Sequence, residues 1–183
     1  MKNIIGLVLL FSLSPVIFAA EGQLPKKTTI LGEELVLKYQ QSESGKTLAE
    51  YIPTGQTLDN WKLMYAIRTY NGSNLDAKAS VMATAQNIKK RKESGDKSAN
   101  YAIFKGDDGS YSIDFLISDQ KTVFEHNIFK YIKTDDGLVS LQVARRLYLK
   151  NKTEKQIKQF FQEIPDIRNR VLKELASQVL PRK

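Results

Sequence analysis

Alternating apolar and polar positions predict that most of the chain forms β-strands. Residues 34–39 and 47–52 alternate on either side of a polar turn at 40–46, and residues 62–70 alternate again. Two further pairs of alternating segments flank short turns that contain Gly and Asp. These pairs are residues 101–105 with 110–117, around the turn 106–109, and residues 122–133 with 138–149, around the turn 134–137. The pattern therefore predicts about six or seven strands, mostly antiparallel.

Two segments carry apolar residues at helical spacing. The first is residues 74–93, with Ser73 or Asn74 as its N-cap. Its recurring apolar positions are Leu75, Ala79, Met82, Ala85 and Ile88. The second runs from residue 153 to about residue 180 and opens with a capping-box sequence. Pro165 lies inside it and should kink or split the helix. The prediction is an α+β fold with two helices, the C-terminal one packed on the sheet.

The first twenty residues have the three-part layout of a secretory signal peptide. Lys2 gives a positive start, residues 4–11 form an apolar run, and the alanines of residues 19–20 suit a cleavage site. The alternative is an uncleaved membrane anchor, but the run is short for a membrane span. We expect cleavage near residue 20, which leaves residues 21–183 as one globular α+β domain. Residues 21–28 are expected to be a flexible lead-in.

Composition narrows the classes of chemistry. The chain has no cysteine, which excludes disulfides, thiol chemistry and cysteine zinc sites. An exported protein without disulfides indicates the periplasm or the medium of a bacterium. After the signal peptide, no apolar run approaches membrane-spanning length. With a single histidine and no glycine-rich phosphate loop, we predict no metal site and no cofactor.

Positive charge is concentrated in the C-terminal region. Residues 21–137 contain 16 Lys/Arg and 16 Asp/Glu, whereas residues 138–183 contain 11 and 4, a net charge of +7. This asymmetry suits an anionic partner: a lipid head group, a glycan or an acidic protein, with no nucleic acid expected. The plainer alternative is a solvated basic face on a terminal helix. The candidate binding residues are Trp61, His126, Arg145, Arg146, Lys150, Lys155 and Lys158.

His126 is the one residue that suggests chemistry. It is in phase with an apolar strand face, and the turn at 134–137 places it opposite Arg145 or Leu147. A histidine and an arginine on such a face need partners, so they could line an anion pocket or a hydrolase site. The alternative that we favour is a structural histidine, with Arg145 reaching solvent. No G-x-S-x-G sequence is present, so we assign no catalytic residue.

Residues 50–61 read EYIPTGQTLDNW. This segment resembles a phrase, E-Y-x-P-x-G-E-T-x-x-N-W, of small exported bacterial proteins of uncharacterised function, with Gln56 in place of the second Glu. The resemblance implies export and a bacterial source, and no activity. Physically, Gly55 should shape a turn, Asn60 should brace it, and Trp61 should plug the edge of the core. The order of elements also resembles PsbP/Mog1-like α+β domains, which implies a fold and no function.

Together these patterns predict an exported, non-enzymatic protein that binds a partner through a sheet-and-helix surface. Two alternatives stay open at this point: a hydrolase with its site around His126, and a secreted effector that acts in a host.

Overall fold

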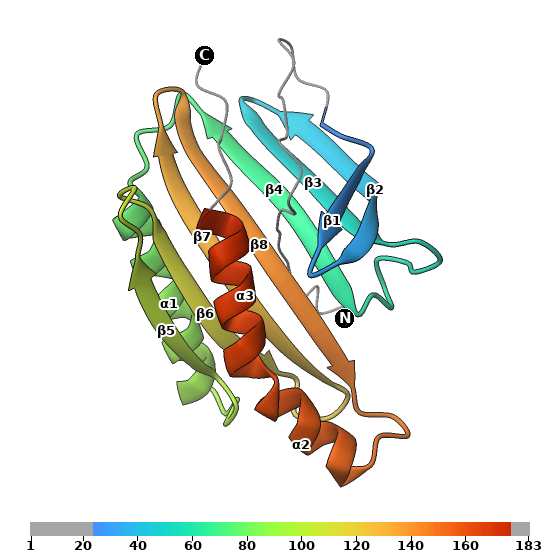
Figure 1. The fold of residues 1–183 in the computed structure, drawn as a ribbon. Helices are drawn as coiled ribbons and strands as arrows, with labels where there is room; N and C mark the ends of the chain where they lie inside the picture. Colours follow the sequence, from blue (N-terminus) through green and yellow to red (C-terminus); the bar gives the residue numbers. More distant parts are fainter. Residues whose placement is uncertain (1–23, 177–183) are drawn as a thin grey trace.

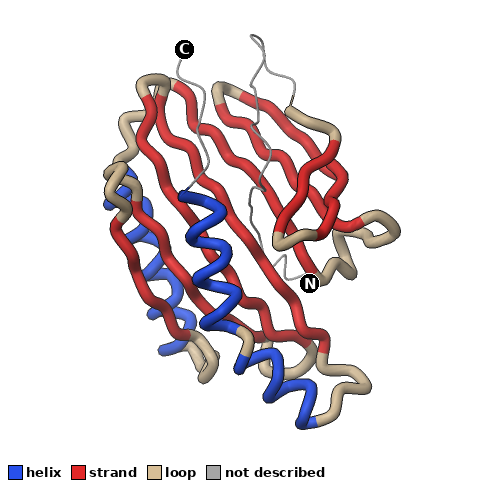
Figure 2. Tube along the Cα trace, viewed as in Figure 1, coloured by secondary structure: helices blue, strands red, loops and turns tan. Residues whose placement is uncertain are grey.

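The computed structural model describes residues 24–176, which form an eight-stranded antiparallel sheet with helices on both faces (Figures 1 and 2). The strands are β1 (Lys27–Ile30), β2 (Glu33–Glu43), β3 (Lys46–Pro53), β4 (Leu63–Asn71), β5 (Asn100–Lys105), β6 (Tyr111–Ser118), β7 (Val123–Thr134) and β8 (Gly137–Tyr148). The helices are α1 (Ala77–Glu93), α2 (Glu154–Gln162) and α3 (Ile164–Ala176). The strand order β1-β2-β3-β4-β8-β7-β6-β5 joins two four-stranded meanders through the antiparallel β4–β8 pair.

The α+β class and the antiparallel sheet are confirmed, but the predicted count of six or seven strands is wrong. The additional strand, β1, begins in the segment 21–28 that was expected to be a flexible lead-in and continues to Ile30, and it pairs with β2. Only Thr28 and Ile30 of β1 point inward and are buried. An alternating pattern with only two inward side chains is too short to be recognised in the sequence. The strand forms because its backbone pairs with β2.

The β2–β3 hairpin is also longer than expected. The segment predicted as a turn, residues 40–46, continues β2 up to Glu43, and the chain reverses at Ser44 and Gly45. Residues 40–43 are exposed and polar, which made them resemble a loop. Their backbone nevertheless pairs with β3, because a hairpin end needs no buried side chains to keep its ladder of hydrogen bonds.

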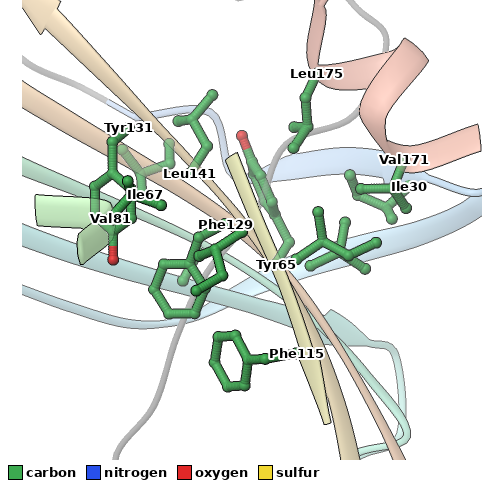
Figure 3. Packing of buried hydrophobic residues seen from close by; sticks show 14 of the residues in the cluster. Ile30, Tyr65, Ile67, Val81, Phe115, Phe129, Tyr131, Leu141, Val171 and Leu175 are labelled. Carbon is green, nitrogen blue, oxygen red and sulfur yellow. The ribbon is translucent and has the colours of Figure 1, made fainter. Parts of the chain in front are cut away.

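The two faces of the sheet carry different helices, and we name each face after its helix. On the α3 face, α3 packs over β7 and buries Val171 and Leu175 against the inner side chains of the curled sheet (Figure 3). On the α1 face, α1 packs over β5, β6 and β7. Aromatic residues of β6 and β7 line this second interface: Phe115, Phe129 and Tyr131.

Helix α1 begins later than predicted. Its N-cap is Asp76, whose side chain accepts a hydrogen bond from Ala79 N at 2.9 Å, so neither Ser73 nor Asn74 caps it. The buried stripe also differs from the expected one, since Leu75 and Met82 are exposed. The residues that face the sheet are Ala77, Val81, Ala85 and Ile88. Small side chains at these positions let the helix approach the large aromatic residues of β6 and β7 closely.

The C-terminal helix is split as predicted. Thr153 forms the capping box with Gln156 at the start of α2, and Pro165 lies in the first turn of α3, two residues after the break at Glu163. Helix α3 is fixed to the far edge of the sheet, because Glu174 accepts a hydrogen bond from Leu31 N at 3.3 Å. The expected extension of this helix to about residue 180 lies outside the described residues, as does the predicted signal peptide of residues 1–20.

Among residues 24–176, no helix has the length and apolar character that crossing a membrane would require.

Candidate functional site

Trp61 lies on the α1 face, just before β4. Its side chain is 2% exposed and packs with Ile52, Met64 and Ala144 in a small separate cluster. The guanidinium of Arg146 lies 3.9 Å from the centre of the indole ring. Trp61 therefore fills the edge of the core, as expected, and its ring is not exposed for contact with a partner.

The segment before Trp61 is a hydrogen-bonded turn. Asn60 Oδ1 accepts from Thr57 N at 2.9 Å, and Gln56 Oε1 accepts from Lys62 N at 2.7 Å. Gly55 has a φ of +85°, in the region that favours glycine. Asn60 therefore braces the turn as expected, and Gln56 performs the same kind of bracing with its amide oxygen.

Arg146 joins Trp61 to a buried polar row across β7 and β8. Its Nε lies 2.6 Å from Glu125 Oε2, and the other oxygen of Glu125 accepts from Asn127 Nδ2 at 3.0 Å. Asn127 in turn accepts a hydrogen bond from Gln142. Glu125, Asn127 and Gln142 are all buried. The charge of Arg146 is thus already neutralised inside the protein.

His126 lies on the opposite face, beneath α3. The register places it across from Arg145, one of the two positions expected, and its Nε2 lies 2.7 Å from Asp114 Oδ1. The second oxygen of Asp114 accepts from Arg168 Nε of α3. Burial pushes the pKa of Asp114 up, but His126 and Arg168 outweigh it and hold that pKa below its usual range. The histidine therefore joins β7 to β6 and, through Asp114, to α3.

Arg145 does not share a site with His126. It reaches α2, where its Nη2 lies 2.8 Å from Glu163 Oε2 and its guanidinium lies 5.2 Å from the ring centre of Phe160. The hydrogen bond from Arg145 lowers the pKa of Glu163. Arg145, Phe160 and Glu163 line a groove of about 340 Å³ between α2 and the sheet. Lys62 and Arg146 also line this groove.

The remaining candidates are lysines at one end of the molecule. Lys150 lies in the loop after β8, and Lys155 and Lys158 lie on α2 (Figure 1). Together with Lys152 we call them the lysine end. All four are exposed, and the part of the chain that the structure describes supplies none of them with an ion pair. Glu154 is the one acidic residue between positions 150 and 158, so this segment has a net charge of +3.

The seven predicted site residues therefore separate into four places. Trp61 and Arg146 are joined on the α1 face, His126 is enclosed on the α3 face, and Arg145 is bound to α2. The lysine end is the part of the predicted set that is open to solvent. Whether any of these residues binds a partner stays a prediction.

Sequence reasoning missed the acidic partners: Asp114, Glu125 and Glu163. Asp114 alternates with the apolar residues Ile113 and Phe115 of β6, and no role was predicted for it from the sequence. Because helices cover both faces there, Asp114 is buried as well. The available signal was a lone acidic residue inside the otherwise apolar run of β6, since such a residue requires a buried cation.

No group of three or more potential metal ligands occurs among the described residues. The arrangement is that of an antiparallel α+β protein in which Asp114, Glu125 and Glu163 pair with arginines and the lysine end is exposed. A family model matches residues 23–180, and the chain belongs to that family, an uncharacterised bacterial one. No curated protein and no solved structure matches the chain. The resemblances to the E-Y-x-P phrase and to PsbP/Mog1-like domains therefore stay predictions.

Proposed function

We propose that the protein is an exported, non-enzymatic binding protein that contacts an anionic partner through the lysine end. The observation that carries this proposal is a contrast within the basic C-terminal region. Arg145, Arg146 and Arg168 are held by carboxylates, whereas the four lysines have no ion pair within residues 24–176. These four unpaired lysines are therefore gathered at one end of the molecule, while Arg170 and Lys173 on α3 are exposed cations away from it.

The packing of α2 defines what kind of contact this end offers. Phe160 is buried, and Phe161 lies edge-on to Phe124, with ring centres 5.0 Å apart. The apolar side of α2 thus packs against the protein interior and is not available for insertion into a bilayer. Its outer side offers ammonium groups, which act as hydrated point charges. The partner is accordingly recognised at its surface, by charge, and binding depends on ionic strength.

Binding assays on the purified protein test the proposal directly. The probes are phosphatidylglycerol vesicles, alginate and polyglutamate, each at low and at high ionic strength. We expect binding to one of these anions, with an affinity that falls as salt is added. A variant with Lys150, Lys152, Lys155 and Lys158 all changed to Gln should lose affinity about tenfold or more, because each lysine near an anionic surface contributes about 1 kcal/mol.

A matched control removes the same charge elsewhere. Lys89, Lys90, Lys92 and Lys97 are exposed residues at and beyond the end of α1. Changing these four to Gln should leave most of the affinity in place. Absence of binding to all three probes at low ionic strength would overturn the proposal. Equal losses in the two quadruple variants would overturn the assignment to the lysine end, because net charge alone would then explain binding.

Export is a separate part of the proposal and rests on the layout of residues 1–20. Fractionation of a bacterium that expresses the chain should find it outside the cytoplasm. N-terminal sequencing of that material should begin near Glu21. Recovery of the full-length chain in the cytoplasm would contradict export without touching the binding proposal. The His126 ring is almost fully buried, so the contacts described above do not favour a hydrolase site there. No contact described above supports the effector alternative.

A further inference from the structure

A pocket of about 470 Å³ lies at the end of the sheet opposite to α2, between the β2–β3 hairpin and the end of β4. Register places several of its lining side chains on the α1 face: Gln41, Glu43, Lys46, Leu48, Arg68 and Tyr70. The volume lies within the range of pockets that bind small molecules. No residue predicted from the sequence as a binding residue belongs to it.

Arg68 is the unusual member of this pocket. It forms no ion pair in the described part of the chain, and its Nη2 is buried without a hydrogen-bond partner. Burial lowers the pKa of Arg68 to about 10, although Tyr70, Tyr131 and Glu50 oppose this shift. Arg68 as a whole is half-buried, and a guanidinium nitrogen that is buried without a bonded acceptor is costly, because its lost hydration is not replaced.

Glu50 is the nearest acidic group, yet it does not pair with Arg68. On β3 and β4 the register aligns Leu48 with Arg68 and Glu50 with Ala66, so the two charges occupy diagonal positions on one face. Glu50 is 6% exposed, and its carboxylate has no hydrogen bond or ion pair within the described ranges. Burial raises the pKa of Glu50 despite the opposing charges of Arg68 and Arg146.

Other buried charges in the molecule are satisfied differently. Asp114, Glu125 and Lys130 each lie within 2.8 Å of an oppositely charged atom. Glu50 and Arg68 are thus a neighbouring but unjoined pair, beside a pocket. If these two residues had only a structural role, we would expect them to form a salt bridge with each other. In a ligand site, polar groups have to stay available to bind the ligand.

We propose that this pocket binds a small monocarboxylate with an apolar body, held by its carboxylate on Arg68. The planar guanidinium donates two parallel hydrogen bonds to a carboxylate, and Lys46 adds positive charge at the rim. Leu48 and Tyr70 offer apolar surface to the body of the ligand. Glu43 and Glu50 repel a second negative charge, so a dianion such as phosphate is disfavoured. The inference is independent of the proposed function, because the lysine end lies at the other end of the sheet.

Titration with benzoate, followed by ¹H–¹⁵N NMR, tests this site. We expect saturable shifts that concentrate at residues 41–48 and 68–70. Benzamide, the neutral isostere, and inorganic phosphate should each bind at least about tenfold more weakly, because each lacks one of the matched features. Absence of saturable shifts with benzoate, or equal affinity for benzamide, would overturn the proposal.

Variants separate a binding role of Arg68 from a structural one. Arg68→Met should weaken benzoate binding about tenfold or more while leaving the protein at least as resistant to urea, since a half-buried charge without an ion pair is removed. Arg170→Met, on the α3 side of the molecule, makes the same change of charge and should bind benzoate as the parent does. If Arg68→Met binds normally, the proposal fails. If it does not fold, Arg68→Lys serves instead, and unchanged benzoate affinity in that variant overturns bidentate recognition.

Glu50→Gln provides a test in the opposite direction. Removing this carboxylate should strengthen benzoate binding several-fold and relieve the discrimination against phosphate. A loss of benzoate affinity in Glu50→Gln would contradict the assigned geometry, because Glu50 would then be a contact that the ligand requires.

Discussion

The arginines and the lysines of the C-terminal region have the same charge and opposite surroundings. Arg145, Arg146 and Arg168 project from β8 and α3 into contact with carboxylates and aromatic rings. Lysines 150, 152, 155 and 158 lie in the adjoining loop and on the outer side of α2, where they are exposed. Few residues along the chain separate the two groups, yet one is part of the interior and the other faces solvent.

This contrast shows that regional net charge is a poor measure of available charge. The excess of +7 in residues 138–183 includes Arg146 and Arg168, which neutralise the acids Glu125 and Asp114 of other strands, while Arg145 pairs with Glu163 inside the region. A planar guanidinium suits such buried, multiply bonded positions, whereas an ammonium on a flexible stem suits solvent. The comparison predicts large stability effects for the arginines and small ones for the lysines.

The largest loss is expected for Arg146→Met, which leaves the buried Glu125 carboxylate without its cation and takes a cation from Trp61. The free energy of unfolding should fall by about 3 kcal/mol, as when one partner of a buried ion pair is removed. Urea denaturation measures the change. The double variant with Glu125→Gln should recover part of the loss, and Arg170→Met should lose little. An Arg146→Met variant as stable as the parent would contradict the claim that the arginines of this region stabilise the interior.

Asp114→Asn should cost about 2 kcal/mol at neutral pH, because asparagine has one acceptor oxygen in place of the two that contact His126 and Arg168, and Arg168 loses its counter-charge. In the parent, the folded-state pKa of Asp114 lies below that of the unfolded chain, about 3.9. Its stabilising contribution is therefore complete above about pH 4 and is lost as the pH falls through the folded-state pKa. Urea denaturation at several acidic pH values should show a shallower decline for the variant. Parallel declines would contradict this assignment.

Arg145→Met should have a smaller effect, about 1 kcal/mol, because its partner Glu163 is partly exposed and water can replace the arginine. For a chain of this size the melting temperature should fall by roughly 2–4 °C. The variant also removes the cation that packs on Phe160. If its free energy of unfolding fell as much as that of Arg146→Met, the contact between Arg145 and α2 would stabilise the protein more than the exposure of Glu163 indicates.

The smallest effect on stability is expected for the quadruple Lys→Gln variant of the lysine end. With no ion pair to lose among the described residues, the free energy of unfolding of the quadruple variant should stay within about 0.5 kcal/mol of the parent, since exposed substitutions have small effects of either sign. Circular dichroism during thermal unfolding checks this. A strong destabilisation would show that these lysines have structural partners, and it would remove the distinction on which the proposed function rests.

The second half of the sheet could be predicted from the sequence because its signals are local. The turn at 134–137 defines the β7–β8 register, in which Thr134 pairs with Gly137 and His126 with Arg145. Gly137 has a φ of +143°, and a Cβ there would lie 2.0 Å from Tyr70 O, so only glycine fits. The capping box and Pro165 likewise marked the helix break through short-range chemistry.

The elements that were misjudged depend on their tertiary partners. β1 exists because β2 offers it a backbone edge, and α3 then closes over Leu31 beside it. Helix α1 buries Val81 instead of Met82 because the aromatic residues of β6 and β7 leave room for small side chains. In the candidate site, the isolated charges on β3, β4 and β6 could be read from the chain, but not which of them would meet. That depends on strand order, which local patterns do not encode.

The sequence by itself determined the α+β class, the antiparallel hairpins, the split C-terminal helix and the charge asymmetry. Periodicity, turn chemistry and composition are local properties, and each of these features follows from them. The tertiary structure alone decided which charges are available. By joining the meanders through β4 and β8, and by placing a helix on each face, it enclosed the arginines with carboxylates and left the lysine end in solvent. It also left Glu50 and Arg68 adjacent but unjoined, because burial and pairing depend on what packs across the sheet.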